Sequence, residues 1–308
     1  MERNYKQTYV FGVKELKQAD IAEAETDARL LLEYVCRSDR NTLLAHGDRA
    51  LSAEEYESYV NYIAERKKHV PLQYITGVQD FMGLEFAVNE HVLIPRQDTE
   101  ILVEEVMRHL HDGMRILDMC TGSGCILLSL LYYSNGCSGV GVDISKEALA
   151  VAAQNARKVG KLKNDTVGIC VCGSNTAKED SISAEFVQSD LFERLEERTG
   201  SFEIIVSNPP YIRSDVIGTL MPEVRDFEPH LALDGQADGL FFYRQIISQA
   251  GKYLTGGGML FLEIGYDQGE AVKALMESAG YLEVEVVKDY AGLDRVVYGV
   301  RNEVTAGC

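Results

Sequence analysis

The sequence has no long hydrophobic run. No apolar stretch approaches the roughly 18 residues that a membrane-spanning helix needs, so we expect no membrane partner. The first residues, Met1 to Tyr5, also lack the apolar segment of a secretory signal peptide. Seven cysteines, mostly inside apolar stretches, indicate reduced thiols. These features together predict a cytoplasmic protein.

The sequence also lacks a zinc-binding pattern. Cys170 and Cys172 are close together, but no His or Cys cluster at the spacing of a zinc site accompanies them. Two thiols in a loop are the simpler interpretation. We therefore expect no metal.

Positive charge is scarce. The chain has 30 Lys and Arg against 48 Asp and Glu, which gives a formal net charge of −18. Such a surface repels phosphate backbones, so we expect no direct nucleic-acid partner, although local basic patches stay compatible with this charge. Of the 308 residues, 46% are hydrophobic, more than one ordinary core needs, and we expect two domains.

Residues 1–75 have the periodicity of a small helical domain. Apolar residues between Ile21 and Val35 fall three or four positions apart, as one face of a helix requires. Ser52 and Glu55 have the spacing of a capping box, and we expect Pro71 to close the helical block. Loose alternation around a glycine predicts a β-hairpin linker over residues 76–94.

Residues 95–308 alternate between strand-like and helical segments, after a helix over 100–110. This alternation predicts a doubly wound α/β domain with a parallel sheet. Polar and glycine residues over 161–184 interrupt it and predict an exposed insertion. The expected strands cover 116–118, 139–143, 202–206 and 259–264, and the expected helices 126–131, 146–156 and 241–254.

A glycine-containing turn follows the first strand of this domain. In doubly wound sheets, ligands bind at the carboxyl ends of the strands. Gly122 and Gly124 allow the backbone to approach a ligand and present amides at a helix N-terminus. Asp143 ends the next strand and suits hydrogen bonds from two ribose hydroxyls. The turn reads Asp118-Met119-Cys120-Thr121-Gly122-Ser123-Gly124.

The glycine turn alone would also fit a dinucleotide. Asp118 favours S-adenosylmethionine, because a carboxylate there would oppose a pyrophosphate but suits a ligand that carries an ammonium and a sulfonium. Asp190 and Leu191 offer an acid and an apolar neighbour for an adenine ring. A strand-end cap is the alternative role for Asp143, and a structural role for Asp190 is about as well supported as cofactor binding.

The strand that begins at Phe202 ends in Asn208-Pro209-Pro210-Tyr211. The two prolines fix the backbone and remove two donors, so this segment is rigid and offers carbonyls. The Asn208 side-chain oxygen and the Pro209 carbonyl can accept both hydrogens of an NH2 group, while the Tyr211 ring stacks on the planar group. An ordinary turn after a strand is the alternative interpretation.

Such an arrangement suits methyl transfer to a planar, amide-type nitrogen. The lone pair of that nitrogen is delocalised, so the nitrogen is a poor nucleophile. Two acceptors that take hydrogen bonds from both N–H groups push electron density toward this nitrogen and fix its line of attack. Positioning and electrostatics therefore carry most of the reduction in the barrier.

The sequence resembles a known family, the protein-(glutamine-N(5)) methyltransferases of peptide chain release factors, of the HemK or PrmC type. The resemblance covers nearly the whole chain. Seven segments carry it: Gln73-Tyr74-Ile75-Thr76-Gly77, Leu93-Ile94-Pro95-Arg96-Gln97-Asp98-Thr99-Glu100, Asn208-Pro209-Pro210-Tyr211-Ile212, Phe227-Glu228-Pro229, Asp238-Gly239-Leu240, Leu262-Glu263-Ile264-Gly265-Tyr266 and Lys288-Asp289-Tyr290-Ala291-Gly292.

The resemblance implies a class I S-adenosylmethionine-dependent methyltransferase with a Rossmann-like, seven-stranded, mainly parallel sheet, here over residues 95–308. It implies that residues 1–75 recognise the release factor and that the enzyme methylates the glutamine of the factor's Gly-Gly-Gln motif, which modulates translation termination. We expect the enzyme to be a monomer. Asn208, Pro209 and Tyr211 would be catalytic, and Pro210 would help them to bind the substrate. The implied cofactor contacts are Asp118, Met119, Cys120, Thr121, Gly122, Gly124, Asp143, Asp190, Leu191 and Asn208.

Three positions depart from the family pattern. Cys120 stands where many members have Gly, so we expect no conformation there that only Gly tolerates. Gln97 replaces a frequent Pro, and Leu191 stands where some members have an aromatic ring for the adenine.

Two other functions compete with the family assignment. A DNA or RNA base-amino methyltransferase, acting on adenine N6 or guanine N2, shares Asn-Pro-Pro-Tyr but should carry a basic patch and a base-flipping target domain. A binding module that has lost its chemistry is the second alternative. The intact glycine turn, Asp143 and Asn208 to Tyr211 argue against it.

Overall fold

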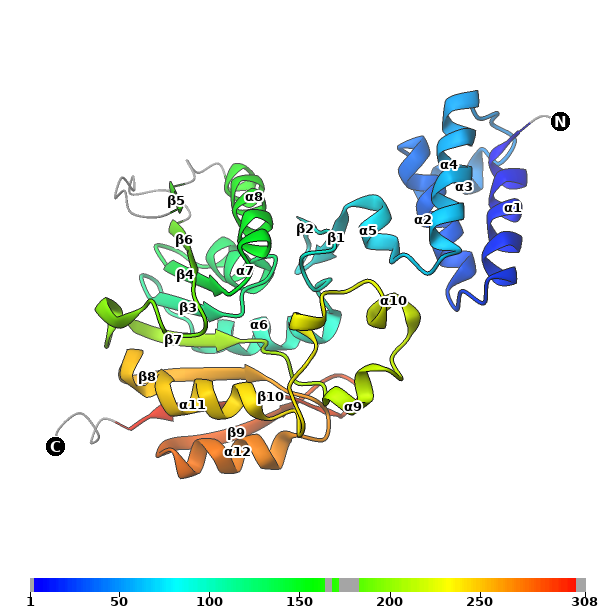
Figure 1. Cartoon of the computed structure of the whole chain (residues 1–308). Coiled ribbons are helices and arrows are strands. Elements are labelled where there is room, and N and C mark those ends of the chain that lie inside the picture. Colours follow the sequence, from blue (N-terminus) through cyan, green and yellow to red (C-terminus); the bar gives the residue numbers. More distant parts are fainter. Residues whose placement is uncertain (1–2, 164–167, 172–182, 303–308) are drawn as a thin grey trace. The chain divides into compact units, whose positions relative to one another are not determined.

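The computed structural model describes residues 3–163, 168–171 and 183–302, and the chain forms two compact units (Figure 1). The N-terminal unit contains Met1–Val78 together with Met221–Phe227, and the sheet unit contains the remaining residues. The sequence analysis did not predict that a segment from the second half of the chain belongs to the N-terminal unit. Among the described helices, none combines the length and apolar character that crossing a membrane requires.

The N-terminal unit is helical, as predicted. Helix α4 begins with the predicted capping box, since Glu55 N donates to Ser52 Oγ over 3.0 Å and Ser52 N donates to Glu55 Oε2 over 2.7 Å. Pro71 does not close the helical block. It precedes one more helix, because its fixed φ suits a helix start. The helices are α1 (Tyr5–Gln18), α2 (Ala24–Cys36), α3 (Arg40–Ala45), α4 (Ala53–Arg66), α5 (Leu72–Thr76) and α10 (Pro222–Arg225).

A close approach of α1 and α4 shapes the core of this unit. A Cβ on Gly12 would lie 1.9 Å from the Tyr59 hydroxyl, so only glycine fits there. The buried Tyr59 hydroxyl donates to the carbonyl of Ala28 in α2 over 3.0 Å. The apolar face predicted for α2 is buried in the same cluster through Leu31 and Leu32.

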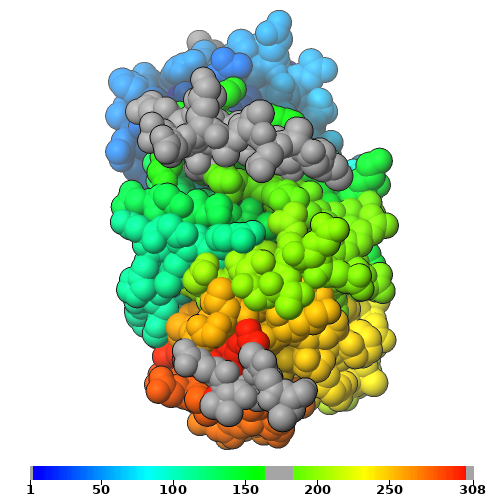
Figure 2. Space-filling model, turned by 90° about the vertical axis from the view of Figure 1, so that its left-hand side faces the viewer, coloured from blue at the N-terminus to red at the C-terminus, as the bar shows by residue number. Residues whose placement is uncertain are grey.

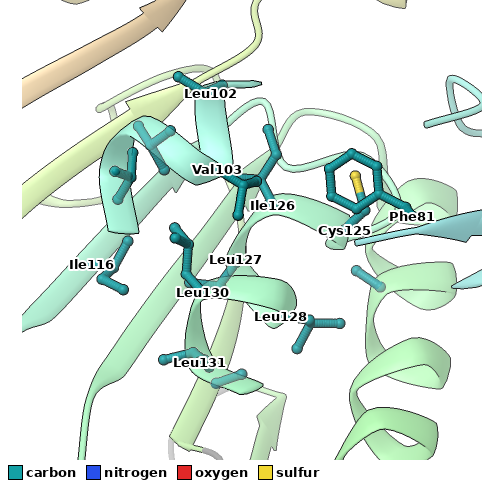
Figure 3. Packing of buried hydrophobic residues seen from close by; sticks show 14 of the residues in the cluster. Phe81, Leu102, Val103, Ile116, Cys125, Ile126, Leu127, Leu128, Leu130 and Leu131 are labelled. Carbon is teal, nitrogen blue, oxygen red and sulfur yellow. The ribbon is translucent and has the colours of Figure 1, made fainter. Parts of the chain in front are cut away.

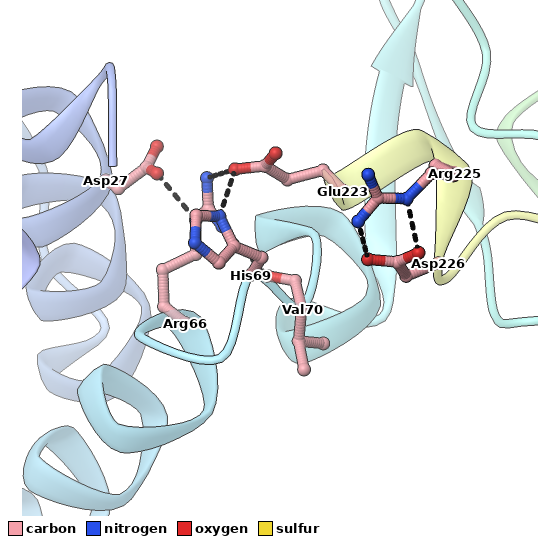
Figure 4. Close-up of polar contacts among 7 residues, drawn as sticks. All are labelled: Asp27, Arg66, His69, Val70, Glu223, Arg225 and Asp226. Atoms are coloured by element: carbon pink, nitrogen blue, oxygen red, sulfur yellow. Dashed lines mark hydrogen bonds and ion pairs between the residues drawn. The ribbon is translucent and has the colours of Figure 1, made fainter. Parts of the chain in front are cut away.

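A buried guanidinium links α2, α4 and α10 (Figure 4). Arg66 Nε donates to Asp27 Oδ2 over 2.7 Å, and Arg66 NH2 donates to Glu223 Oε1 over 2.8 Å. His69 Nδ1 lies 3.3 Å from the same oxygen of Glu223. Since the Arg66 side chain is only 8% exposed, both ion pairs are largely removed from water.

The sheet unit has a mixed, mainly parallel sheet, which confirms the predicted fold class. The strands lie in the order β5-β6-β4-β3-β7-β8-β10-β9, and only β10 runs antiparallel to its neighbours. The strands are β3 (Arg115–Met119), β4 (Ser138–Asp143), β5 (Gly168–Val171), β6 (Ser183–Gln188), β7 (Phe202–Ser207), β8 (Leu254–Glu263), β9 (Tyr281–Lys288) and β10 (Asp294–Arg301).

The sheet has eight described strands where seven were expected. The additional edge strand, β5, pairs in parallel with β6 and falls within the predicted insertion of residues 161–184. The same stretch contains the end of helix α8 (Lys146–Leu162) and the start of β6. Residues 164–167 and 172–182 of the predicted insertion, including Cys172, lie outside the described residues.

Helices cover both faces of the sheet (Figure 1). On one face lie α6 (Gln97–His109), α7 (Cys125–Tyr133) and α8, and on the other α11 (Phe241–Tyr253) and α12 (Gly269–Ser278). Residues Cys125 to Leu131 of α7 are all buried, as its predominantly apolar sequence predicts, and Figure 3 shows how the apolar side chains among them pack. In the surface view of Figure 2, the lime residues around β7 lie between the green residues and the orange residues of β8, in agreement with the strand order.

The predicted hairpin consists of β1 (Val78–Phe81) and β2 (Leu84–Ala87). Met82 and Gly83 form its turn with φ of 50° and 69°, the left-handed region that a tight hairpin turn requires. Phe81, Leu84 and Phe86 are buried in the same cluster as α6, α7 and α8. The hairpin is thus packed into the core of the sheet unit.

Candidate functional site

A cavity of about 340 Å³ lies where the parallel strands end. The loops that follow β3, β4, β6 and β7 meet there, as expected for a doubly wound sheet. Residues before and inside the first turn of α6 form another part of the wall, together with residues from the segment before α11. The predicted site residues on the wall are Met119, Cys120, Thr121, Gly122, Asp143, Asp190, Leu191, Asn208 and Pro210.

The turn after β3 has three residues with positive φ. Cys120, Gly122 and Gly124 have φ of 61°, 54° and 80°. Cys120 occupies the left-handed region at a cost of about 1 kcal/mol, so this position favours glycine without requiring it. A Cβ on Gly122 would meet nothing within 4 Å, so this backbone is open to a ligand. Gly124 does not line the cavity but packs against Ala152 of α8.

Asp118 lies behind the turn and does not line the cavity. It is fully buried, and its Oδ2 accepts a hydrogen bond of 2.6 Å from Thr121 Oγ1. Its Oδ1 has no partner among the described residues. Burial raises the pKa of Asp118 to about 7, although the bond from Thr121 works in the opposite direction. The predicted direct contact between Asp118 and a cofactor stays a prediction.

Asp143 both caps the turn and lines the cavity. Its Oδ2 accepts from Gly122 N and its Oδ1 from Ser145 N, each over 2.9 Å. Burial raises the pKa of Asp143, and these backbone bonds partly oppose the rise. Since each carboxylate oxygen has two lone pairs, both can still accept a bond from a ligand hydroxyl.

Asp190 and Leu191 follow β6 and lie on the wall. Leu191 is half-buried with φ of 45°, whereas the next residue, Phe192, is buried and stacks on Tyr253 with ring centroids 4.6 Å apart. The aromatic ring therefore belongs to the core. Leu191 is the apolar residue that this loop offers to a ligand.

The tetrapeptide after β7 contributes two of its residues to the cavity, Asn208 and Pro210. Asn208 Nδ2 donates to Thr99 Oγ1 over 3.2 Å. Pro209 is buried and does not line the cavity, and neither does Tyr211, whose hydroxyl donates to Glu263 Oε1 over 3.4 Å. Burial raises the pKa of Tyr211, so its phenol stays neutral at physiological pH. The predicted roles of the Pro209 carbonyl and the Tyr211 ring stay predictions.

Two glycines and a glutamine hold the backbone of Tyr211. A Cβ on Gly235 would lie 2.7 Å from Tyr211 Cα, and one on Gly239, which has φ of 72°, would lie 2.5 Å from Tyr211 O. Gln268 Nε2 donates to the same carbonyl over 3.0 Å. Sequence reasoning gave these residues no role. The only signal was that Gly239 falls within a family signature.

Arg96 and Glu228 form an ion pair at the cavity. Arg96 lies on the wall and donates to Glu228, which is buried. Burial raises the pKa of Glu228, and Arg96 opposes this rise. Among the described residues, no group of three or more His, Cys, Asp or Glu could hold a metal ion.

Known proteins resemble the chain along most of its length. Residues 7–77 match the family model of the PrmC N-terminal domain, and residues 110–167 match a methyltransferase domain. The release factor glutamine methyltransferase of Clostridium acetobutylicum is 41% identical over 277 residues, which cover 89% of this chain and 90% of the relative. That of Caulobacter vibrioides is 40% identical over 289 residues, 93% of each chain.

Among solved structures, the release factor-specific protein-(glutamine-N5) methyltransferase of Alicyclobacillus acidocaldarius is 29% identical. The similarity covers 70% of this chain and 99% of that chain, with a TM-score of 0.39.

Proposed function

The chain belongs to the release factor glutamine methyltransferases, and we propose that its cavity is where the glutamine of a Gly-Gly-Gln motif receives its methyl group. The enzyme transfers a methyl group from S-adenosylmethionine to the side-chain amide nitrogen of that glutamine in peptide chain release factors. One observation supports the location above all. The cofactor turn, Asp143 and Asn208 line one cavity, although they stand at the ends of three different strands.

The cavity fits S-adenosylmethionine in size and in chemistry. Its volume of about 340 Å³ lies within the range of small-molecule sites. Asp143 would accept hydrogen bonds from the ribose hydroxyls, Leu191 would contact the adenine, and the open backbone at Gly122 would lie against the methionine part. When bound, this cofactor supplies an electrophilic methyl group on a sulfonium.

Asn208 prepares the acceptor nitrogen. Its own amide nitrogen is engaged by Thr99, so its oxygen is the group that remains to accept a hydrogen from the substrate NH2. The Pro209 carbonyl would accept the other hydrogen. Two prolines hold these acceptors in place before the substrate arrives, so little reorganisation is needed in the transition state.

The N-terminal unit would bind the release factor. Its match to the PrmC N-terminal domain supports this role. Release factors act on ribosomes, so we place the enzyme in the cytoplasm, and we propose that it works as a monomer. The formal net charge of −18 disfavours nucleic acid as the substrate.

Mass spectrometry of the product tests the function. Enzyme and methyl-labelled S-adenosylmethionine are incubated in parallel with a release factor, with DNA and with RNA. We expect label only in the release factor, as a single methyl on the glutamine of Gly-Gly-Gln, and none in a factor whose glutamine is replaced. A methyl on another residue, or transfer to either nucleic acid, would overturn the proposal.

A further inference from the structure

The first turn of α6 binds several separate parts of the sheet unit. Asp98 Oδ2 lies 3.0 Å from Arg295 NH2 of β10, and Glu100 Oε1 accepts a 2.6 Å bond from Met82 N of the hairpin turn. Thr99, between them, lines the cavity and accepts the bond from Asn208. The turn that carries Thr99 is therefore fixed on both sides of it.

Behind Thr99 lies a buried carboxylate. Glu263 ends β8, which is the neighbour of β7, and the pairing of Ser207 with Leu262 puts Glu263 level with Asn208. It is 1% exposed. The Tyr211 hydroxyl donates to Glu263 Oε1 over 3.4 Å, and the neighbouring Thr99 hydroxyl acts to lower the pKa of the same carboxyl. Glu263 is therefore linked to both ends of the Asn208-to-Tyr211 segment.

Donor and acceptor rules give this chain of bonds a direction. An ionised carboxylate can only accept, so the Thr99 hydroxyl turns its single proton toward Glu263, whose charged form it favours. The Thr99 oxygen must then accept from Asn208, and only the nitrogen end of the Asn208 amide can donate. The amide nitrogen consequently faces Thr99, and the amide oxygen is turned away from it.

We infer that Thr99 and Glu263 are positioning residues, which hold the Asn208 side chain with its oxygen toward the substrate nitrogen. This inference rests on the function proposed above. Neither residue needs to touch the glutamine. With the opposite orientation, Asn208 would present NH2 to NH2, and the hydrogen bond that activates the nitrogen would be lost.

The surroundings of Glu263 make this orientation sensitive to pH. Burial raises the pKa of Glu263 to about 7, while Thr99 and Arg295 act to lower it. A protonated Glu263 can donate to Thr99, and the direction of the chain of bonds is then no longer fixed. The charged and titratable groups that act on Glu263, or lie against it, are Arg295 of β10, Asp98 of α6, Tyr211 after β7, Tyr243 of α11 and Cys125 of α7.

Substitution of Thr99 tests the inference. Thr99→Val keeps the shape and removes the hydroxyl, so we expect kcat on release factor to fall by about tenfold, as for one lost neutral hydrogen bond. Thr99→Ser should restore most of kcat. The matched control is Ser129→Ala, which removes a buried hydroxyl of α7 that has no partner in the described structure and should leave kcat unchanged. Affinity for S-adenosylmethionine, measured by calorimetry, should stay within about twofold in all variants, since no charged bond to the ligand is lost.

The pH profile separates positioning from packing. At saturating substrates, kcat of the wild-type enzyme should fall below a pH of about 7, where Glu263 takes up a proton. Glu263→Gln and Thr99→Val should both lose this acid limb, because neither can transmit the protonation to Asn208. A variant that is only less stable would keep it.

An NMR measurement needs neither substrate nor cofactor. The side-chain NH2 resonances of Asn208 should shift between pH 6 and pH 8 in the wild type and stay constant in Thr99→Val. Wild-type kcat together with an intact acid limb in Thr99→Val, or an Asn208 resonance that does not respond to pH, would overturn the inference. Failure of the wild type to methylate the glutamine, with the NMR coupling present, would overturn the proposed function instead.

Discussion

At the scale of single residues, the two halves of the site depend on different chemistry. Asp143 offers a negative charge to the cofactor side, and its oxygens already hold the backbone of the turn. Asn208 offers a neutral, directional acceptor to the substrate side. Substitutions at the two residues should therefore separate binding from chemistry.

Replacement of Asn208 should act on the chemical step. We expect Asn208→Ala to lower kcat by about 10²–10³-fold, as for the loss of one preorganised polar contact in the transition state. Affinity for S-adenosylmethionine should change much less. Asn135→Ala, at an exposed asparagine before β4, serves as the control and should keep wild-type kcat. Undiminished turnover by Asn208→Ala would contradict the assigned role.

Replacement of Asp143 should act on binding. Loss of a pair of charge-assisted bonds should weaken S-adenosylmethionine binding by about 1.5–3 kcal/mol in Asp143→Ala. The same change frees the amides of Gly122 and Ser145, so Asp143→Asn, which keeps one acceptor oxygen, should lose less. Calorimetry on the two folded variants measures their affinities for S-adenosylmethionine. Unchanged affinity in Asp143→Ala would remove the residue from the site.

The sequence predicted residues that line the cavity but not the contacts that hold those residues in position. Asp143 and Asn208 could be assigned because each stands at the end of a strand, and parallel strands end at one edge of a sheet. Thr99 could not, because its bond to Asn208 joins positions that are 109 residues apart. The contact between Glu263 and Tyr211 likewise depends on the pairing of β7 with β8, which the periodicity of the sequence does not predict.

At the scale of elements, local patterns predicted the helices and strands and failed on their pairing. The central strands and α7 follow from apolar runs and turn residues. The strand order, in which β10 lies between β8 and β9, cannot be predicted from the local pattern of apolar and turn residues. The association of Met221–Phe227 with the N-terminal unit depends on Glu223, an ordinary surface residue by sequence, meeting the buried Arg66.

Gly239 fixes the position of the loop that contains Tyr211. Gly239→Ala places a Cβ against the Tyr211 carbonyl and puts a side chain at φ of 72°, so we expect a loss of about 1–3 kcal/mol in the free energy of unfolding. Displacement of Tyr211 should lower kcat as well. Gly218→Ala is the matched control, since a Cβ there meets nothing within 4 Å at a negative φ. Equal thermal stability of the two variants would contradict this account.

Arg66 holds the N-terminal unit together. Arg66→Met leaves the carboxylates of Asp27 and Glu223 buried without their cation, which should cost about 3–5 kcal/mol. If this unit binds the release factor, KM for the factor should rise while affinity for S-adenosylmethionine stays constant. Adding Asp27→Asn and Glu223→Gln to Arg66→Met should recover part of the stability. Denaturant unfolding and steady-state kinetics measure the two effects, and an unchanged KM would argue against the recognition role.

At the scale of the whole molecule, acidic groups affect the stability of the folded state in two ways. The formal net charge of −18 makes the folded state repel itself, and salt screens this repulsion. Two carboxyls inside the sheet unit behave differently, because burial raises the pKa of Asp118 and of Glu263 to about 7. Salt screens the interactions of these buried carboxyls much less than those of surface charges.

Both effects predict that the protein is more stable at pH 5.5 than at pH 7.5. The folded pKa of each buried carboxyl lies above the unfolded value of 3.8 for Asp118 and 4.5 for Glu263, so folding favours the protonated form. The resulting stabilisation is complete below the unfolded pKa and is lost as pH rises through about 7. Between these limits Asp118 should contribute at most about 4 kcal/mol and Glu263 at most about 3 kcal/mol.

Urea unfolding at the two pH values, in low and in high salt, separates the causes. High salt should reduce the part that comes from net charge and leave the part that comes from the buried carboxyls. Glu263→Gln should reduce the remaining pH dependence, and Ser129→Ala should not. Stability that increases from pH 5.5 to pH 7.5 would contradict the burial of ionisable carboxyls. Because kcat is expected to fall over the same interval in which stability rises, a loss of activity below pH 7 can be assigned to protonation at the site rather than to unfolding.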